Sequence, residues 1–205
     1  SCIASKRFIV TKSVAKEFTE KFIQKTEKLR VGDPLDDDTD IGPLINIKGL
    51  ETIETMVKDS IESGADLYAG GKRSSNKEGY FYEPTILGKV APNMHVAQEE
   101  VFGPVAPILV VENERDAIQL ANETLYGLGA SLWTQNLTKA ESYSDLIEAG
   151  VVTVNNIVAS DPRVPFGGIK KSGFGRELSR YGMLEFANIK SVRFYDELVH
   201  QHHVE

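Results

Sequence analysis

Apolar residues recur along the chain at two spacings, and the spacing changes from one segment to the next. Intervals of three and four residues predict helices, whereas short β-branched runs predict strands. The predicted helices span residues 13–29, 47–63, 114–122, 137–149 and 176–186, and the predicted strands span 7–10, 65–69, 84–86, 108–111, 130–133, 151–155 and 189–195. Because strands alternate with long helices, the order indicates an α/β fold with an open, largely parallel sheet and flanking helices.

The first two predicted helices have clear apolar faces and recognisable ends. Ser13 is expected to cap the first helix, and Gly64 is expected to end the second in a left-handed conformation, as Gly150 does for the helix over 137–149. The side chains expected on the buried faces are Phe18, Phe22 and Leu29 in the first helix and Leu50, Ile53, Val57 and Ile61 in the second. We therefore expect both helices to pack on the sheet, and we expect the strand over 130–133 to be buried.

The apolar run over 189–195 follows the last predicted helix, in a place where a chain end usually frays. A strand here needs the edge of a sheet, which either this chain or a partner chain can offer. Both alternatives remain open from the pattern alone.

Composition limits the class of protein. The chain has 205 residues, of which 41% are hydrophobic, and this is enough apolar material for a core. The net charge of −7 disfavours nucleic acid as a partner. The apolar run Val105–Val111 contains a proline and falls well short of the ~20 residues that span a membrane. The single cysteine excludes an internal disulfide and fits a reducing, cytoplasmic location.

A glycine-dense segment runs from Pro165 to Glu177 and leads into the last predicted helix. Its glycines are Gly167, Gly168, Gly173 and Gly175. Glycine loses more conformational entropy on folding than other residues, so we expect a close backbone approach or a positive φ here. The simpler alternative is a tight surface turn.

Two further blocks accompany this segment: Cys2 within Ser-Cys-Ile-Ala-Ser-Lys, and the block Glu-Glu-Val-Phe-Gly-Pro over Glu99–Pro104. Each block alone is a weak signal, but the three occur in the order and at the separations of one family. Together they resemble the aldehyde dehydrogenase family over essentially the whole chain. The resemblance implies a catalytic domain over residues 1–188 and an oligomerisation strand with a polar tail over 189–205. It also implies that the family's N-terminal cofactor-binding domain is absent.

Cys2 is the candidate nucleophile. A thiolate is the most nucleophilic ordinary side chain near neutral pH, and its acyl product is activated toward water. An arbitrary free cysteine more often behaves as a small buried hydrophobe. The resemblance reverses that expectation, because Cys2 occupies the family's catalytic position.

Glu100 and Phe102 are the candidate cofactor-binding residues. A carboxylate can accept two hydrogen bonds from a ribose diol, and an aromatic ring can pack against a nicotinamide. From composition alone, Glu100 would belong to a solvated loop and Phe102 to a core. The resemblance implies instead that Glu100 holds the nicotinamide ribose and that Phe102 lies beside the nicotinamide, with NAD or NADP as the cofactor.

Ser160, Arg163 and Phe166 are the candidate substrate-binding residues. They follow the strand over 151–155, where α/β folds commonly place substrate contacts. The resemblance implies that Phe166 lines the aldehyde tunnel. The loop Ala-Ser-Asp-Pro-Arg is similar to that of bacterial and archaeal succinate-semialdehyde dehydrogenases, in which an arginine and a hydroxyl can hold a substrate carboxylate. Alternatively, Arg163 pairs with Asp161 at the surface.

The histidines His95, His200, His202 and His203 lack the spacing of a zinc site, so no metal is predicted. The resemblance thus implies part of an NAD(P)-dependent aldehyde dehydrogenase that oxidises an aldehyde, succinate semialdehyde in particular, through a cysteine thiohemiacetal and thioester. A homo-dimer or homo-tetramer is expected, with no nucleic acid or membrane partner. The alternatives are a generic aldehyde dehydrogenase of other substrate range and a non-catalytic, oligomerising module.

Overall fold

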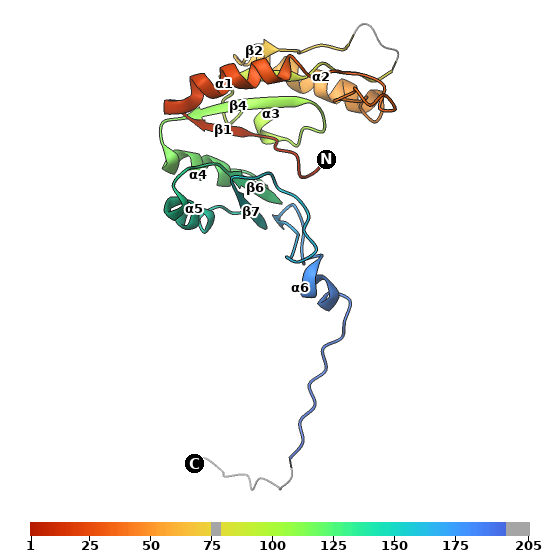
Figure 1. Ribbon diagram of the computed structural model, residues 1–205, viewed down its shortest axis with the longest axis vertical. Coiled ribbons are helices and arrows are strands. Elements are labelled where there is room, and N and C mark those ends of the chain that lie inside the picture. The colour runs from red at the N-terminus through yellow and green to blue at the C-terminus, as the bar shows by residue number, and fades with distance from the viewer. Residues whose placement is uncertain (75–78, 196–205) are drawn as a thin grey trace.

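The computed structural model describes residues 1–74 and 79–195. Its main sheet has four strands in the order β1-β4-β3-β2, and Figure 1 labels β1, β2 and β4. These strands are β1 (Phe8–Thr11), β2 (Asp66–Ala69), β3 (Thr85–Gly88) and β4 (Val105–Val111). The pairs β1–β4 and β3–β4 are parallel, whereas β2 joins β3 antiparallel. The α/β prediction with a largely parallel sheet is therefore confirmed, with one antiparallel edge strand.

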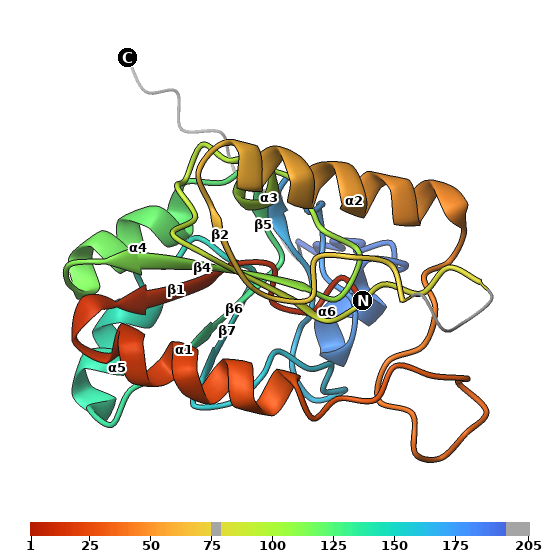
Figure 2. The same cartoon turned by 90° about the horizontal axis from the view of Figure 1, so that it is seen from above.

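The sheet is covered on both faces by helices (Figure 2). Successive side chains of a strand point to opposite faces, and the buried neighbours Ile86 and Leu87 belong to two different apolar clusters. Ile86 packs with Phe18 and Phe22 of α1 (Lys12–Thr26). Leu87 belongs to the cluster that contains Leu50, Ile53 and Val57 of α2 (Ile47–Glu62). The predicted apolar faces of both helices are thus confirmed at these five positions.

Strand β4 begins at Val105, before the predicted start at residue 108, because Pro107 does not interrupt it. Proline lacks a backbone N–H, so it argues against a central strand. In the structure, β4 pairs with β3 over Val105–Pro107 and with β1 from Ile108 onward. Pro107 therefore lies where the pairing passes from one neighbour to the other.

Several predicted details of the first two helices are wrong. Helix α1 begins at Lys12 after Thr11, so Ser13 is not its cap, and it ends at Thr26, so Leu29 lies beyond it and is 40% exposed. Ile61 is 37% exposed at the last turn of α2. Gly64 follows that helix with φ of 105°, as predicted. Asn46, which the sequence analysis did not select, caps α2 by accepting from the Gly49 N–H at 2.8 Å.

The second half of the chain forms two small sheets rather than extending the main one. Strand β6 (Gly129–Leu132) pairs parallel with β7 (Val151–Val154), and β5 (Tyr126–Gly127) pairs antiparallel with β8 (Ile169–Lys170). The prediction that 130–133 is a buried strand is wrong, because β6 is only partly buried and Trp133 beyond it is exposed. The remaining helices are α3 (His95–Gln98), α4 (Glu114–Asn122), α5 (Leu137–Ser144) and α6 (Ser179–Leu184).

Helix α4 has the predicted bounds, whereas α5 and α6 are shorter than predicted. After α5, the Leu146 carbonyl accepts from Asn122 Nδ2 and the Glu148 N–H donates to Asn122 Oδ1, both at 2.8 Å. Asn122 thus takes the Leu146 carbonyl and the Glu148 N–H, which a continued helix would use, and Gly150 is not a helix cap. Helix α6 starts late because Glu177 is bridged to Phe166 and Leu178 has a φ of 62°.

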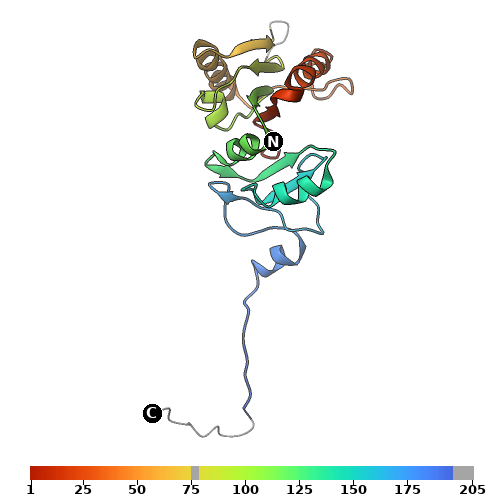
Figure 3. The same cartoon turned by 90° about the vertical axis from the view of Figure 1, so that its left-hand side faces the viewer.

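The main sheet with α1, α2 and α3 forms a first lobe, and the two small sheets with α5 form a second lobe. After α6 the chain leads away from both lobes (Figure 3). Residues 189–195 form no strand within the described part of the chain, and the apolar side chains there are exposed. The alternative in which this segment pairs with a sheet of its own chain is therefore wrong, and oligomerisation stays a prediction. The predicted polar tail over 196–205, with His200, His202 and His203, lies outside the described residues. None of the helices in the described residues is long and apolar enough to cross a membrane.

Candidate active site

The turn that carries Cys2 lies beside the loop that carries Glu100 and Phe102. The Ala4 N–H donates to the Ser1 carbonyl at 3.2 Å, which closes the turn around Cys2. Lys6 Nζ donates to the same carbonyl at 3.0 Å and lies 4.6 Å from the centre of the Phe102 ring. Cys2 itself is exposed. Two of the three sequence blocks are thereby brought together through Lys6, which the sequence analysis did not select.

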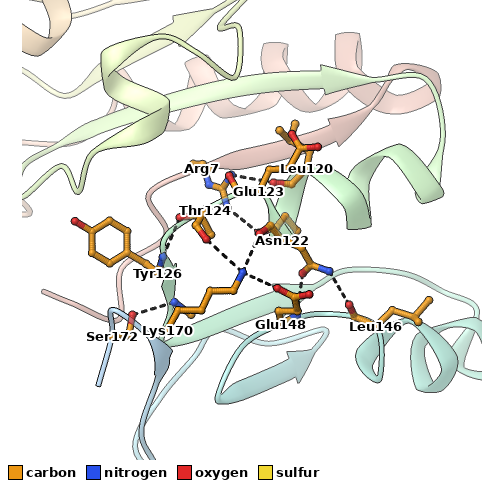
Figure 4. A network of polar contacts seen from close by, with 12 residues as sticks. Arg7, Leu120, Asn122, Glu123, Thr124, Tyr126, Leu146, Glu148, Lys170 and Ser172 are labelled. Atoms are coloured by element: carbon orange, nitrogen blue, oxygen red, sulfur yellow. Dashed lines mark hydrogen bonds and ion pairs between the residues drawn. The ribbon is translucent and has the colours of Figure 1, made fainter. Parts of the chain in front are cut away.

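Arg7 anchors the segment between Cys2 and β1. Its guanidinium donates to the Leu120 carbonyl at 2.9 Å and to the Ala121 carbonyl at 2.8 Å, both at the C-terminal end of α4 (Figure 4). The last carbonyls of a helix lack helical partners and carry partial negative charge, so a cation is favourable there. Burial lowers the pKa of Arg7, and the charge of Glu123 acts in the opposite direction.

A polar network extends this anchor into the second lobe (Figure 4). Lys170 on β8 donates to the carbonyls of Asn122 and Thr124, at 2.8 and 3.2 Å, and pairs with Glu148 at 2.6 Å. The end of α4 therefore receives Arg7 from one lobe and Lys170 from the other. No local sequence pattern marks these contacts, since Arg7 and Lys170 both bind groups far away in the sequence, most of them backbone carbonyls.

Two closely packed residues, Val101 and Gly103, fix the loop over Glu99–Pro104. Val101 is buried, and a Cβ added at Gly103 would lie 1.9 Å from Ile53 Cδ1, so the loop backbone packs closely on α2. Glu100 and Phe102 flank the buried Val101, and Phe102 is 55% exposed. The loop thus offers a carboxylate and an aromatic face to a ligand.

Arg163 pairs with Asp161 at the surface, which is one of the two alternatives predicted for this side chain. Its Nε and Nη2 bind the Asp161 carboxylate at 2.9 and 2.6 Å, and its side chain is 85% exposed. The hydrogen bond from Arg163 lowers the pKa of Asp161 to about 2, and the same bond raises the pKa of Arg163. Ser160 is also exposed. The described hydrogen bonds and ion pairs of the Arg163 side chain stay within its own loop, so they do not join it to the Cys2 turn.

Phe166 lies at the start of the glycine-dense segment and is buried. Its backbone exchanges two hydrogen bonds with Glu177, at 2.9 and 2.8 Å, and this bridge closes the segment into a loop. An open pocket of about 410 Å³ adjoins this loop, lined by Phe166, Phe174, Arg176 and Glu185 among others. Phe166 therefore contributes to the wall of a surface pocket.

The glycines of this segment meet the expectation of close approach and positive φ. A Cβ added at Gly150, just before β7, would lie 1.8 Å from the Gly167 carbonyl oxygen. Gly173 and Gly175 have φ of 131° and 65°, which residues with a side chain rarely adopt. The segment is thus a loop seated on the second lobe and more than a surface turn.

The remaining titratable residue singled out from the sequence, His95, lies 3.2 Å from Asp59 Oδ2 through its Nδ1. Within residues 1–74 and 79–195, no group of three or more His, Cys, Asp or Glu side chains is arranged to hold a metal ion.

The three blocks lie on one α/β chain, and comparison with known proteins identifies their family. Residues 1–192 match the aldehyde dehydrogenase family, so the chain belongs to that family. It is 47% identical over 192 residues to a succinate-semialdehyde dehydrogenase [NADP(+)] of Mycobacterium leprae, covering 94% of this chain and 42% of that protein. A probable succinate-semialdehyde dehydrogenase [NADP(+)] of Synechocystis is 48% identical with the same coverage. The chain therefore spans about 42% of the length of these relatives.

Solved structures agree with the family. The crystal structure of succinate-semialdehyde dehydrogenase from Burkholderia pseudomallei superposes with a TM-score of 0.87 at 38% identity, covering 91% of this chain and 38% of that one. Betaine aldehyde dehydrogenase from Staphylococcus aureus, in complex with NAD+, gives a TM-score of 0.88 at 32% identity, covering 96% of this chain and 42% of that one. The fold observed here is thus that of the corresponding part of these enzymes.

Proposed function

We propose that residues 1–188 are the catalytic-domain portion of an NAD(P)-dependent aldehyde dehydrogenase and that 189–205 form its oligomerisation strand and polar tail. The complete enzyme means here a protein with the full length of the relatives, of which this chain spans about 42%. It oxidises an aldehyde to a carboxylic acid, and succinate semialdehyde is the proposed substrate. Family membership and the names of the relatives support this assignment.

One observation carries the proposal: the Cys2 turn lies next to the Glu100 and Phe102 loop, with Lys6 in contact with both. Aldehyde oxidation requires a nucleophile close to the place where a hydride is accepted. Cys2 is exposed, as a nucleophile that must reach a substrate carbonyl has to be. Cys2 and the proposed cofactor loop are therefore close together, as the proposed reaction requires.

In this reaction the Cys2 thiolate attacks the aldehyde carbonyl and forms a thiohemiacetal. Loss of a hydride leaves a thioester on Cys2, and water then releases the acid and restores the thiol. NAD or NADP supplies the hydride acceptor when it is bound. The exposed Phe102 ring and the Glu100 carboxylate beside it fit such a cofactor, because they offer a stacking face and an acceptor for ribose hydroxyls. The names of the curated relatives favour NADP.

For the substrate, we propose that Phe166 lines the aldehyde path and that Ser160 and Arg163 receive the distal carboxylate. Asp161 occupies Nε and Nη2 of Arg163, and in the described residues Nη1 takes part in no hydrogen bond. A carboxylate can therefore reach Arg163 through Nη1, where it shares the charge of the guanidinium with Asp161. The succinate-semialdehyde dehydrogenase names of the relatives support this choice of substrate.

The test is Cys2→Ser in the complete enzyme, with Ser1→Ala in the same turn as the matched control. Serine is nearly isosteric with cysteine but is a far poorer nucleophile at neutral pH. We expect Cys2→Ser to abolish aldehyde-dependent NAD(P)H formation while cofactor binding and the far-ultraviolet circular dichroism spectrum are retained. Turnover of Cys2→Ser at the rate of Ser1→Ala would refute the assignment.

A second candidate function is a non-catalytic, oligomerising module. It is favoured by the apolar side chains that the terminal segment leaves exposed, among them Ile189, Val192 and Phe194. Equilibrium binding of NAD and NADP to the 205-residue chain, beside the complete enzyme, separates the two candidates. Binding by the complete enzyme alone, together with self-association of the chain in sedimentation, would favour the module for the isolated chain.

A further inference from the structure

Lys6 is the point at which the nucleophile turn and the cofactor loop meet. Its ammonium donates to the Ser1 carbonyl, the acceptor that also closes the turn around Cys2. The same ammonium lies over the ring of Phe102, 4.6 Å from its centre. The Lys6 side chain therefore bonds to Ser1, directly before Cys2, and covers Phe102 in the loop of Glu100.

The electrostatic surroundings of Lys6 involve the same groups. Lys6 is partly buried, and this burial lowers the pKa of its ammonium, whereas the charges of Glu100 and Cys2 act in the opposite direction. Both the carboxylate and the sulfur are thus close enough for their charge to act on Lys6.

A simpler explanation is that Lys6 only shields the Phe102 ring from water. A cation over a half-exposed ring contributes little, on the order of 0.5–1 kcal/mol, so that contact alone would not single Lys6 out. The hydrogen bond to Ser1 and the charges of Glu100 and Cys2 are additional, and each belongs to the candidate active site. Shielding a ring does not require any of them.

We propose that Lys6 is a positioning residue that couples the Cys2 turn to the loop of Glu100 and Phe102 and holds a positive charge on the Ser1 carbonyl, one residue before Cys2. The inference rests on the proposed function in that Cys2 is the nucleophile. Lys6 acts through its neighbours, since it holds the turn and the loop in one arrangement and offsets the negative charge of Glu100 where the thiolate must form. This role goes beyond those proposed for Cys2, Glu100 and Phe102.

The charge is tested on the 205-residue chain, in which Cys2 is the single cysteine. Alkylation of Cys2 is followed with iodoacetate, which is anionic, and with iodoacetamide, which is neutral and of similar size. The ratio of the two rates measures the local charge and cancels the accessibility of the thiol. The variants are Lys6→Met, Lys6→Arg and Glu100→Gln, and the control is Lys12→Met, which removes an equal charge from an exposed pair with Glu112.

We expect Lys6→Met to lower the iodoacetate-to-iodoacetamide ratio by about three- to fivefold, as one charge a few ångström away does in a water-like dielectric. Lys6→Arg should retain the ratio, Lys12→Met should leave it unchanged, and Glu100→Gln should raise it. The α-amino group of Ser1 is present in every variant, so it cancels from the comparison. An unchanged ratio in Lys6→Met would overturn the inference, and if that variant fails to fold, an unchanged ratio in Glu100→Gln would do so.

A second measurement, in the complete enzyme, tests the coupling of the two segments. Lys6→Met should lower kcat and single-turnover hydride transfer about tenfold or more, with little change in KM for the aldehyde, and Lys6→Arg should restore most of the loss. If the wild-type enzyme oxidises no aldehyde, the proposed function fails whatever the alkylation ratio. If the wild-type enzyme oxidises aldehydes, and Lys6→Met equals it in the alkylation ratio and in kcat, only the inference about Lys6 fails and the proposed function stands.

Discussion

The guanidinium of Arg163 and the carboxylate of Asp161 form a bidentate ion pair on the surface of the loop before Phe166. The pairing lowers the pKa of Asp161 to about 2 through the hydrogen bond from Arg163. A depressed carboxylate pKa means that the pair is complete above the ordinary aspartate range and is lost only as the pH falls toward 2. At the pH of any ordinary assay, Asp161 therefore competes with a substrate carboxylate for Arg163.

The first prediction concerns this competition in the complete enzyme. Arg163→Ala should lower the preference for succinate semialdehyde over butanal about tenfold, the lower end for a charge-assisted hydrogen bond, because Asp161 already shares the guanidinium. The loss should appear as a higher KM for the acid, with KM for butanal nearly unchanged. Steady-state kinetics on both aldehydes measure it.

Asp161→Asn provides the matched control for Arg163→Ala. It removes the competing charge and keeps the shape of the side chain, so it should strengthen the preference for the acidic aldehyde. An equal loss of kcat/KM for both aldehydes in Arg163→Ala would mean that Arg163 serves only its loop. The proposed substrate would then lose its structural support, and a generic aldehyde dehydrogenase would be the better assignment.

The second prediction concerns Glu100, again in the complete enzyme. Glu100→Gln should weaken cofactor binding and slow single-turnover hydride transfer by about tenfold or more, since a ribose diol loses a charged acceptor. KM for the aldehyde should change little. Glu99→Gln removes the neighbouring carboxylate and should have a much smaller effect. The ribose role of Glu100 has to be abandoned if hydride transfer is equally fast in both variants.

The fold could be predicted from the sequence wherever local pattern and tertiary packing agree. Helix α4 has the predicted bounds because a capping residue, Asn113, and the apolar periodicity both favour them. Helix α5 ends early because Asn122, far away in the sequence, binds the backbone of the following turn. Strand β4 was predicted too short because the penalty for Pro107 depends on which neighbour is paired at that residue.

The candidate site could likewise be predicted from the sequence only in part. The blocks around Cys2 and Glu100 could be found from their sequence, and the structure brings their segments together. Lys6 and Arg7 could not be found, because their importance lies in contacts with a ring and with carbonyls that no local pattern predicts. The two alternatives for Arg163 could be stated from the sequence, but choosing between them required the geometry of Asp161.

The third prediction tests how the glycine-dense segment is seated. Gly150→Ala should destabilise the 205-residue chain by about 3 kcal/mol or more, at the upper end of overpacking, because the new Cβ would meet the Gly167 carbonyl oxygen, a backbone atom. Gly49→Ala is the control: its Cβ would have ordinary contacts, the nearest at 3.6 Å, within helix α2. Alanine is the better helix former, so Gly49→Ala should be neutral or slightly stabilising. Urea unfolding measures both, and equal midpoints would contradict the close approach.

The last prediction concerns Arg7 as the link between the Cys2 segment and α4. Arg7→Met keeps much of the side-chain volume but removes the donor to the Ala121 carbonyl and one of the two donors to the Leu120 carbonyl, which also accepts from the Glu123 N–H. Because these bonds are charged and partly buried, we expect a loss of about 2 kcal/mol in the free energy of unfolding of the 205-residue chain. Arg7→Lys should recover part of it, since an ammonium can still donate but lacks the planar fork that spans both carbonyls.

Lys21→Met is the control for Arg7→Met, because it removes a cation from an exposed pair with Glu17 on α1. Exposed pairs contribute little, so this variant should stay within about 0.5 kcal/mol of the wild-type chain. Hydrogen exchange supplies the local readout: in Arg7→Met the amides at the end of α4 and in the turn that follows it should exchange faster, while those of α2 keep their protection. If Arg7→Met were as stable as Lys21→Met and exchange were unchanged, Arg7 would not anchor the strand that follows Cys2.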